Sequence, residues 1–304
     1  MSSKKAGPVR AVIIGLGSTG FVFGVVAPWL PWGNLLPLWA LLIFLAANGA
    51  LVFIIVRDVQ LTSRRHRYPV RWKAPRGARQ DSRQPPEDYY LMVLGSGGHT
   101  KEMLMMMDDG FCDFGGLHRR YLISSGDTMS LNHVEDYEAD LRQLCDSNGC
   151  DPGSYDVRFV TRARRVHQSL LTTPLTALAS LYDIVFNVLL SPPSNRVGQK
   201  LRYPRMIFSN GPATGFFVGL AVNYLKVFYV IPEDRCFFVY IESWARISSL
   251  SLTGKLIYYT GIADAFAVQH EQVASTYGVH NAGPMVFNSR RSDDTETNGP
   301  KPRG

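Results

Sequence analysis

The sequence predicts an α/β protein in which a doubly wound parallel sheet is preceded by an N-terminal membrane anchor. Three observations lead to this prediction. No Asp, Glu, Lys or Arg occurs in the 46 residues between Arg10 and Arg57. The next stretch, 57–83, carries eight Arg and one Lys against two Asp, a net charge of +7 that equals the net charge of the whole chain. From residue 89 onward, short apolar runs alternate with segments of helical periodicity, which is typical of sheets built from β-α-β units.

The uncharged N-terminal stretch predicts one or two transmembrane helices within residues 1–56. Residues 35–56 form an apolar run of 22 residues, which is long enough to cross the hydrocarbon core of a bilayer. The arginines that follow place the C-terminal side of this span in the cytosol. Residues 11–30 are a second candidate, and two spans would form a hairpin with both ends in the cytosol. The alternative for 11–30 is a signal-like segment or one that only enters the membrane interface.

The basic segment 57–88 predicts a linker on the membrane surface, because anionic lipids attract positive residues next to a span. Nucleic-acid binding is not expected, since no nucleic-acid-binding motif accompanies the basic stretch. The four cysteines have no spacing typical of a metal site, and we expect neither a metal nor a cofactor. Cys145 and Cys150 can bridge in an oxidising compartment, whereas free thiols are expected in a reducing one.

Six apolar runs predict the strands of the parallel sheet, and the segments between them predict its helices. The strands are expected at 89–94, 120–125, 155–160, 205–210, 237–242 and 265–269. The helices are expected at about 100–109, 130–145, 166–190, 213–229 and 270–277. This pattern predicts a Rossmann-like domain at 89–287 and a polar tail at 288–304. Because the helices at 166–190 and 213–229 are unusually apolar, they are either core helices or helices with one face on the membrane.

A glycine-rich loop between the first strand and the first helix predicts a phosphate site. It consists of Gly95, Ser96, Gly97, Gly98, His99 and Thr100. Glycines let backbone N–H groups approach a phosphate, and the helix N-terminus favours negative charge. Ser96 and Thr100 are expected to add hydroxyl donors, and His99 to contact the diphosphate or to take a proton. Glu102 is interpreted as a complement to the helix dipole. The alternative is a tight turn that binds nothing.

Two further groups follow other predicted strands, whose carboxyl ends meet at one edge of the sheet. Asn210 and Gly211 follow the strand at 205–210, where they either line the same crevice as the glycine loop or form a simple turn. Arg162 and Arg164 follow the strand at 155–160, where they either contact an anionic ligand or lie in a solvated loop.

The strand at 237–242 is followed by Glu242, Ser243 and Arg246. Glu242 and Arg246 are four residues apart, so one interpretation is that they pair on one face of a helix. The other is that Glu242 binds a sugar hydroxyl and Arg246 a phosphate.

The glycine loop and four later segments together resemble one known family. The segments are LMVLGSGGHTKEML (91–104), RARRVHQS (162–169), MIFSNGPATG (206–215), YIESWARISSLSLTGKLIY (240–258) and ADAFAVQH (263–270). In this order they are similar to the membrane-anchoring subunits of the dolichol-pathway UDP-N-acetylglucosamine transferase, an asparagine-linked glycosylation family whose members pair with a separate small catalytic subunit. The resemblance covers roughly residues 89–287.

This resemblance implies the acceptor half of a GT-B glycosyltransferase split onto two chains, with UDP-GlcNAc bound by the partner. The pair would add the second GlcNAc to dolichyl-diphosphate-GlcNAc on the cytosolic face of the endoplasmic reticulum or nuclear envelope, in N-linked glycan precursor synthesis. The chain alone would be inactive. The implied diphosphate or acceptor contacts are Gly95 to His99, Asn210, Gly211, Glu242, Ser243 and Arg246. The candidate base is His99, with a base on the partner as the alternative.

The domain size is consistent with this half-enzyme, because about 200 residues suit a single doubly wound domain. The apolar segment 11–30 and the long connection within 226–242 depart from the family pattern. Two other functions are possible. A membrane-bound Rossmann oxidoreductase is disfavoured because GSGGHT lacks the G-x-G-x-x-G pattern. The second of these functions is that of a scaffold whose glycine loop binds nothing.

Overall fold

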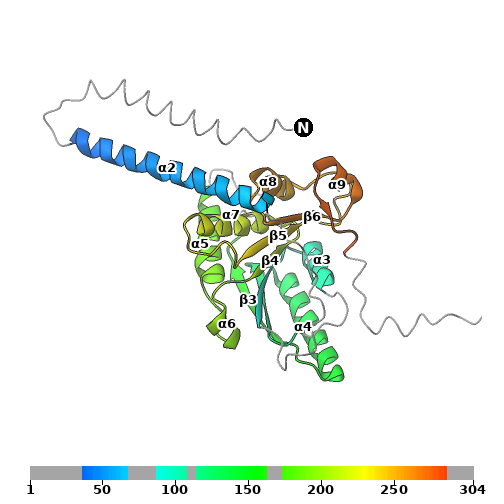
Figure 1. Ribbon diagram of the computed structural model, residues 1–304. Coiled ribbons are helices and arrows are strands. Elements are labelled where there is room, and N and C mark those ends of the chain that lie inside the picture. Colours follow the sequence, from blue (N-terminus) through cyan, green and yellow to red (C-terminus); the bar gives the residue numbers. More distant parts are fainter. Residues whose placement is uncertain (1–35, 68–86, 108–113, 163–172, 286–304) are drawn as a thin grey trace, which may run out of the picture. The chain divides into compact units, whose positions relative to one another are not determined.

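The computed structural model describes residues 36–67, 87–107, 114–162 and 173–285 (Figure 1). The chain divides into two compact units, Met1–Tyr68 and Pro69–Gly304, which are described separately. The predicted second span at 11–30 and the polar tail at 288–304 lie outside the described residues.

The described part of the first unit is one long helix, α2 (Leu36–Arg67). Its segment Trp39–Arg65 is 27 residues long and contains an 18-residue window with a mean hydropathy of 2.5, so the helix is long and apolar enough to cross a membrane. Asn48 donates its side-chain amide to the carbonyl of Phe44 at 2.8 Å, so this polar group is satisfied by its own helix. The helix continues beyond Val56, where the linker was expected to begin, because Gln60, Leu61 and several arginines favour helix and no Pro or Gly occurs before Pro69.

The described residues of the second unit form a parallel sheet of seven strands. The strands are β1 (Asp88–Val93), β2 (Leu117–Ser124), β3 (Ser154–Val160), β4 (Met206–Ser209), β5 (Phe237–Ile241), β6 (Ala265–Val268) and β7 (His280–Asn281). Their order is β3-β2-β1-β4-β5-β6-β7, and every pair is parallel. The order reverses between β1 and β4, which is the switch point where such sheets bind ligands. The predicted doubly wound fold is confirmed, and β7 is an additional strand at the edge.

Helices cover both faces of the sheet (Figure 1). α3 (Gly98–Met107) and α4 (Thr128–Asn148) pack on the face that carries Met92 and Tyr121. The opposite face, which carries Leu91 and Leu122, is covered by α5 (Thr173–Asp183), the π-helix η3 (Ile184–Leu189), α7 (Ala213–Val227) and α8 (Leu252–Thr260). The short helices α6 (Arg196–Lys200) and α9 (Glu271–Tyr277) complete the unit. α6 and α8 were not predicted, and the other described helices lie at the expected places.

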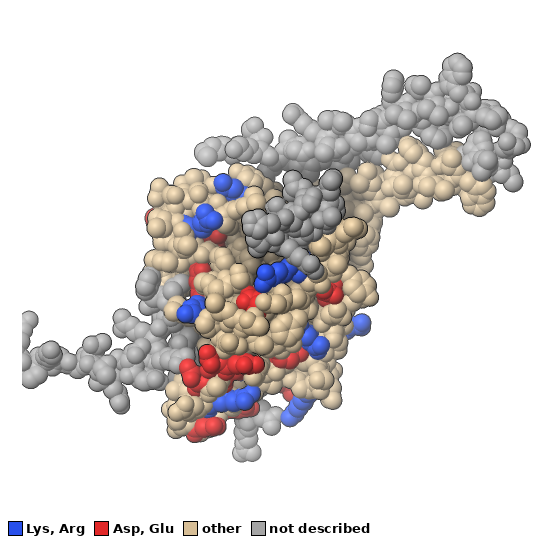
Figure 2. Space-filling view, turned by 180° about the vertical axis from the view of Figure 1, so that it is seen from behind, with Lys and Arg blue, Asp and Glu red and all other residues tan. Residues whose placement is uncertain are grey.

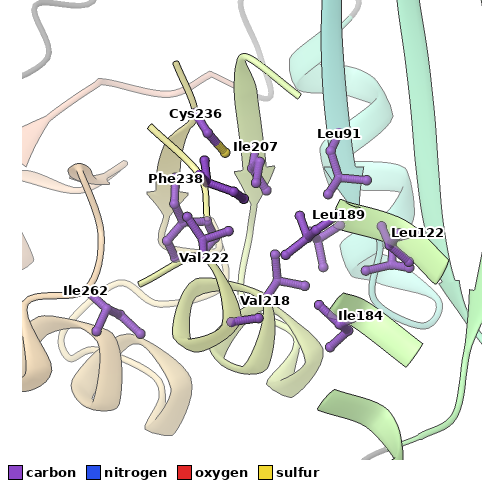
Figure 3. Packing of buried hydrophobic residues seen from close by; sticks show 14 of the residues in the cluster. Leu91, Leu122, Ile184, Leu189, Ile207, Val218, Val222, Cys236, Phe238 and Ile262 are labelled. Carbon is purple, nitrogen blue, oxygen red and sulfur yellow. The ribbon is translucent and has the colours of Figure 1, made fainter. Parts of the chain in front are cut away.

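The main core lies between the sheet and the α5–α7–α8 layer. Ile207 and Phe238 project from the central strands against Val218 and Val222 of α7 (Figure 3). Gly219 of the same helix allows this contact, because a Cβ there would lie 2.5 Å from the ring of Phe238. The close approach of α7 sets the position of the loop between β4 and α7, which forms part of the site.

Strand β2 begins earlier than predicted because its charged residues are buried in pairs. Arg119 makes a two-point ion pair with Glu138 of α4, at 2.8 and 2.7 Å. Arg120 pairs in the same way with Asp156 of β3 and also donates to the carbonyl of Val188 at the end of η3. Charge in the run LHRRYLIS argued against a buried strand, but each guanidinium has a carboxylate partner, which makes the burial tolerable.

Asp156 is the acceptor of this second cluster. Burial alone would raise the pKa of Asp156, but hydrogen bonds from His118 and Arg120 outweigh it and hold the pKa well below its usual value. The ionised carboxylate therefore links β2, β3 and, through Arg120, the end of η3.

The helices α5, η3 and α8 carry both buried and exposed apolar residues. Ile184, Val188 and Ile257 are buried against the sheet. Other apolar side chains of these helices are exposed, and we call them the outer apolar face: Leu175, Leu178, Tyr182 and Phe186 on α5–η3 and Leu252, Leu256 and Tyr259 on α8. The spacing of the first four residues places them on one side of the helix. The segment predicted at 166–190 therefore contributes to the core and also presents apolar side chains to its surroundings.

Charge on the second unit is mixed. Figure 2 shows basic and acidic side chains interspersed on the face that it displays. The cysteines among the described residues, Cys145, Cys150 and Cys236, are free thiols, as expected for a reducing compartment. Cys112 lies outside the described residues.

Candidate functional site

The candidate site lies where β1 and β4 end, at the reversal of strand order. Strand β1 leads into the loop Gly95–Gly97, and α3 begins at Gly98. Gly97 has φ +60°, a conformation that glycine adopts without strain. A Cβ at Gly97 or Gly98 would meet no atom within 4 Å, and Ser96 and Gly98 are exposed. The start of α3 is therefore open to a ligand, and its N–H groups and helix dipole favour an anion.

His99 lies in a narrow slot between this loop and the loop that follows β4. A Cβ on Gly95 would lie 2.9 Å from the Cβ of His99 and 2.9 Å from that of Pro212. A Cβ on Gly211 would lie 3.0 Å from Cε1 of the His99 ring. Asn210 is buried and donates its side-chain amide to the carbonyl of His99 at 2.7 Å. The structure thus brings His99, Asn210 and Gly211 together, as the shared sheet edge suggested.

Thr100 faces the interior instead of the open loop. It is fully buried, and its hydroxyl bonds to the carbonyl of Gly95 and to the hydroxyl of Ser130. Ser130 is held in turn by Asp127, whose carboxylate caps α4. The expectation that Thr100 donates to a phosphate does not fit this geometry. Its role is to fix the carbonyl of Gly95, so the loop keeps its shape.

Glu102 connects the glycine loop to the loops after β5 and β6. Its carboxylate accepts hydrogen bonds from the Ser243 hydroxyl at 2.8 Å, the Trp244 backbone N–H at 2.5 Å and the Gln269 amide at 2.9 Å. Nδ1 of His99 lies 3.8 Å from its Oε2 atom. Burial alone would raise the pKa of Glu102, but the nearby His99 imidazole and the hydrogen bonds from Trp244, Ser243 and Gln269 bring the pKa below its usual value.

The interpretation of Glu102 as a complement to the helix dipole is therefore wrong, because Glu102 lies beyond the first turn of α3, where the dipole acts, and its carboxylate is held by the loops after β5 and β6. The sequence signal that could have revealed it is the i, i+3 spacing from His99, which places the two side chains on one side of α3. Trp244 and Gln269 were also missed, since a backbone N–H and a lone amide leave no pattern in a sequence.

Glu242 supports the fold of the loop that follows β5. It is buried, and its carboxylate accepts hydrogen bonds from the N–H of Ser243 at 3.1 Å and from the N–H and hydroxyl of Ser251 at 3.0 and 3.1 Å. The loop is not helical, so the expected pairing of Glu242 and Arg246 on one helical face is wrong. With its oxygens engaged in the loop, Glu242 is not presented to a sugar hydroxyl, whereas Arg246 is exposed.

Of the two predicted arginines after β3, the structure describes Arg162, and β2 separates the strand before it from β1. Arg162 is partly exposed and follows β3, which lies beyond β2 from β1. Arg164 lies outside the described residues. Within the described part of the chain, no cluster of three His, Cys, Asp or Glu side chains is suited to a metal ion. The chemistry available at the site is anion binding by backbone amides next to a half-exposed imidazole.

Comparison with known proteins gives consistent results along this unit. Residues 90–283 match the family model described as "Oligosaccharide biosynthesis protein Alg14 like". The Schizosaccharomyces pombe protein "UDP-N-acetylglucosamine transferase subunit alg14" is 35% identical over 206 residues, covering 66% of this chain and 85% of that protein. The Cryptococcus neoformans protein of the same description is 34% identical over 201 residues, covering 64% and 79%. The human protein is 31% identical over 187 residues, covering 62% and 77%.

Among solved structures, MurG of Acinetobacter baumannii is similar with a TM-score of 0.34 and 12% identity, covering 60% of this chain and 41% of the MurG chain. The family model spans more than half of the present sequence and includes every strand from β2 to β7 and most of β1. On this evidence the chain belongs to the Alg14-like family of oligosaccharide biosynthesis proteins.

Proposed function

We propose that this chain is the membrane-anchoring, acceptor-binding subunit of a UDP-GlcNAc transferase that acts in N-linked glycan precursor synthesis. It binds dolichyl-diphosphate-GlcNAc at the cytosolic face of the endoplasmic reticulum and recruits a small catalytic subunit that carries UDP-GlcNAc. The observation that carries this proposal is the open start of α3 beside His99, at the switch point of a domain whose relatives are named as UDP-N-acetylglucosamine transferase subunits.

A diphosphate is the ligand that suits the glycine loop. The exposed positions Ser96 and Gly98 offer backbone N–H groups at the positive end of α3. The open space above Gly97 and Gly98 leaves room for a bulky phosphate. The sugar of the acceptor then lies toward His99, whose side chain is 38% exposed.

Two features support a location at a membrane. α2 is long and apolar enough to span a bilayer, and its C-terminal end carries Arg57, Arg64 and Arg65, which favour the cytosolic side. The outer apolar face of the second unit contains aromatic and aliphatic side chains that suit a lipid interface. A polyisoprenoid substrate is itself confined to the membrane, so an anchored subunit meets it in two dimensions.

The proposed reaction transfers the sugar from the partner-bound donor to the acceptor hydroxyl. The hydroxyl oxygen forms a bond to C1 of the donor GlcNAc, while the bond between C1 and the phosphate oxygen breaks and UDP leaves with the electron pair. The proton of the hydroxyl passes to His99. A single doubly wound sheet supplies one half of a GT-B cleft, which is why a second chain is required.

Co-purification of the chain with its catalytic subunit from membranes, followed by transfer from UDP-GlcNAc to a lipid-diphosphate-GlcNAc acceptor, tests the proposal. The complex is expected to transfer the sugar, and the chain alone to transfer none. Gly98→Val fills the open space above the helix start and is expected to abolish transfer while partner recruitment persists. Full transfer by this variant would favour a scaffold that binds nothing, and robust transfer by the chain alone would contradict the subunit role.

A further inference from the structure

Within the described part of the chain, one hydrogen-bond acceptor position remains on the carboxylate of Glu102. Each carboxylate oxygen accepts about two hydrogen bonds. Oε1 accepts two, from the Trp244 N–H at 2.5 Å and the Gln269 amide at 2.9 Å. Oε2 accepts one, from the Ser243 hydroxyl at 2.8 Å. The remaining position on Oε2 faces Nδ1 of His99, at 3.8 Å.

The His99 ring presents the matching donor. Its Nδ1 atom is shielded from solvent and makes no hydrogen bond within the described part of the chain. The side chain as a whole is 38% exposed, so the exposed part of the ring lies away from Nδ1. Gly95 and Gly211 hold the ring closely on either side, and a Cβ at Gly211 would lie 3.3 Å from Nδ1. The ring is thus confined with its buried nitrogen toward the carboxylate.

The carboxylate itself is held rigidly. Its three donors come from the loops after β5 and β6, and Trp244 is fixed further by His270, whose Nε2 lies 2.6 Å from the Trp244 carbonyl. Glu102 is buried, so water does not compete for its last acceptor position. A small rotation of the His99 ring, on the order of 1 Å at Nδ1, closes the gap, and catalytic hydrogen bonds commonly tighten in this way when substrate binds.

We propose that Glu102 is a positioning residue for sugar transfer: its Oε2 atom accepts the Nδ1–H of His99 and leaves Nε2 as the unprotonated nitrogen that faces the acceptor. This inference rests on the proposed function, in which His99 takes the proton of the acceptor hydroxyl. When Nε2 accepts that proton, the imidazole becomes positively charged, and the adjacent carboxylate stabilises it. As the new bond to C1 forms and UDP departs, the proton stays on Nε2 while Nδ1 remains bonded to Glu102.

The test uses the full chain in complex with its catalytic subunit and compares initial rates at varied concentrations of lipid-diphosphate-GlcNAc. The variants are Glu102→Gln, Glu102→Asp, His99→Ala and the double variant Glu102→Gln/His99→Ala. Glu102→Gln is expected to lower kcat about tenfold or more, since it removes part of the 10²–10⁴-fold that a general base contributes. KM for the acceptor is expected to stay near the wild-type value, and Glu102→Asp to restore part of kcat.

The double variant separates positioning from structural support. If Glu102 acts through His99, then Glu102→Gln has no further effect on kcat once His99 is alanine. Ser243→Ala is the matched control, because it removes one hydrogen bond from the same carboxylate without removing the charge. It is expected to lower the thermal midpoint as Glu102→Gln does, but to lower kcat less.

Four outcomes overturn the inference and can be told apart. Wild-type kcat in Glu102→Gln would overturn the role of Glu102 alone, and so would an equal loss of kcat in the wild-type and His99→Ala backgrounds. Wild-type kcat in His99→Ala would overturn His99 as the base and Glu102 with it, while the subunit function would stand. A wild-type complex that transfers no sugar would overturn the proposed function as well.

Discussion

Replacing Gly211 by alanine tests whether the slot around His99 matters for function. The added Cβ would lie 3.0 Å from Cε1 of the His99 ring and 3.3 Å from Nδ1. These separations are tighter than ordinary carbon contacts of about 3.5–4.0 Å, so the ring must move by several tenths of an ångström. Movement of the ring away from Gly211 changes the distance between Nδ1 of His99 and Glu102, and it changes the direction in which Nε2 points.

The substitution has two separable consequences. Gly211 has φ +121°, a conformation that costs an alanine about 1–3 kcal/mol in folding free energy. Displacement of the ring affects the reaction itself, where a misplacement of about 1 Å can reduce the rate about a hundredfold. We therefore expect a lower thermal midpoint together with a fall in kcat of about tenfold to a hundredfold.

The assay measures sugar transfer per folded complex, alongside the thermal midpoint of each variant. Gly149→Ala is the matched control, because Gly149 has φ +66° at the end of α4 and a Cβ there would meet no atom within 4 Å. This control is expected to lose about 1 kcal/mol of stability without loss of transfer per folded complex. If Gly211→Ala retained wild-type kcat while showing the same loss of stability, the reasoning about the His99 slot would be refuted.

Three other predictions follow from the structure. Because the pKa of Asp156 is low in the folded chain, its ion pair stabilises the fold fully above about pH 4, the usual aspartate range. This contribution is lost as the pH falls further. Thermal midpoints measured between pH 3 and 7 should therefore show a smaller acid-induced drop in Asp156→Asn than in wild type. Gly254→Ala would place a Cβ 2.0 Å from Oε2 of Glu242, so it should lower the unfolding free energy by about 1–3 kcal/mol through lost hydrogen bonds, and an unchanged denaturation midpoint would contradict this. Leu252→Glu, in the outer apolar face, should lower transfer to an acceptor in lipid vesicles about tenfold, as the burial of one leucine predicts, yet not transfer to a short-chain acceptor in detergent. Met129→Glu, at an exposed position on α4, is its control and should change neither rate.

The strands could be predicted because their signal is local. Runs such as YYLMV in β1 and FFVYI in β5 are apolar along their length because helices cover both faces of the sheet, so their composition alone indicates a buried strand. Strand β2 shows the limit, since its buried arginines contradict the local pattern until Glu138 and Asp156 are brought beside them. The helix α8 was missed for a related reason. Its start depends on Ser251, whose hydroxyl caps the N–H of Gly254 and is itself held by Glu242.

By itself, the sequence determined the doubly wound domain, the apolar span and the glycine loop at a helix start, because each depends on residues close together in the chain. The tertiary structure alone decided which side chains face the open loop and which hold it in place. Thr100 turned inward toward Ser130, and Glu102 found its partners at Ser243 and Gln269, 141 and 167 residues away. Hydrogen bonds between loops that distant arise only when the strands are ordered in the sheet, and local periodicity contains no record of that order.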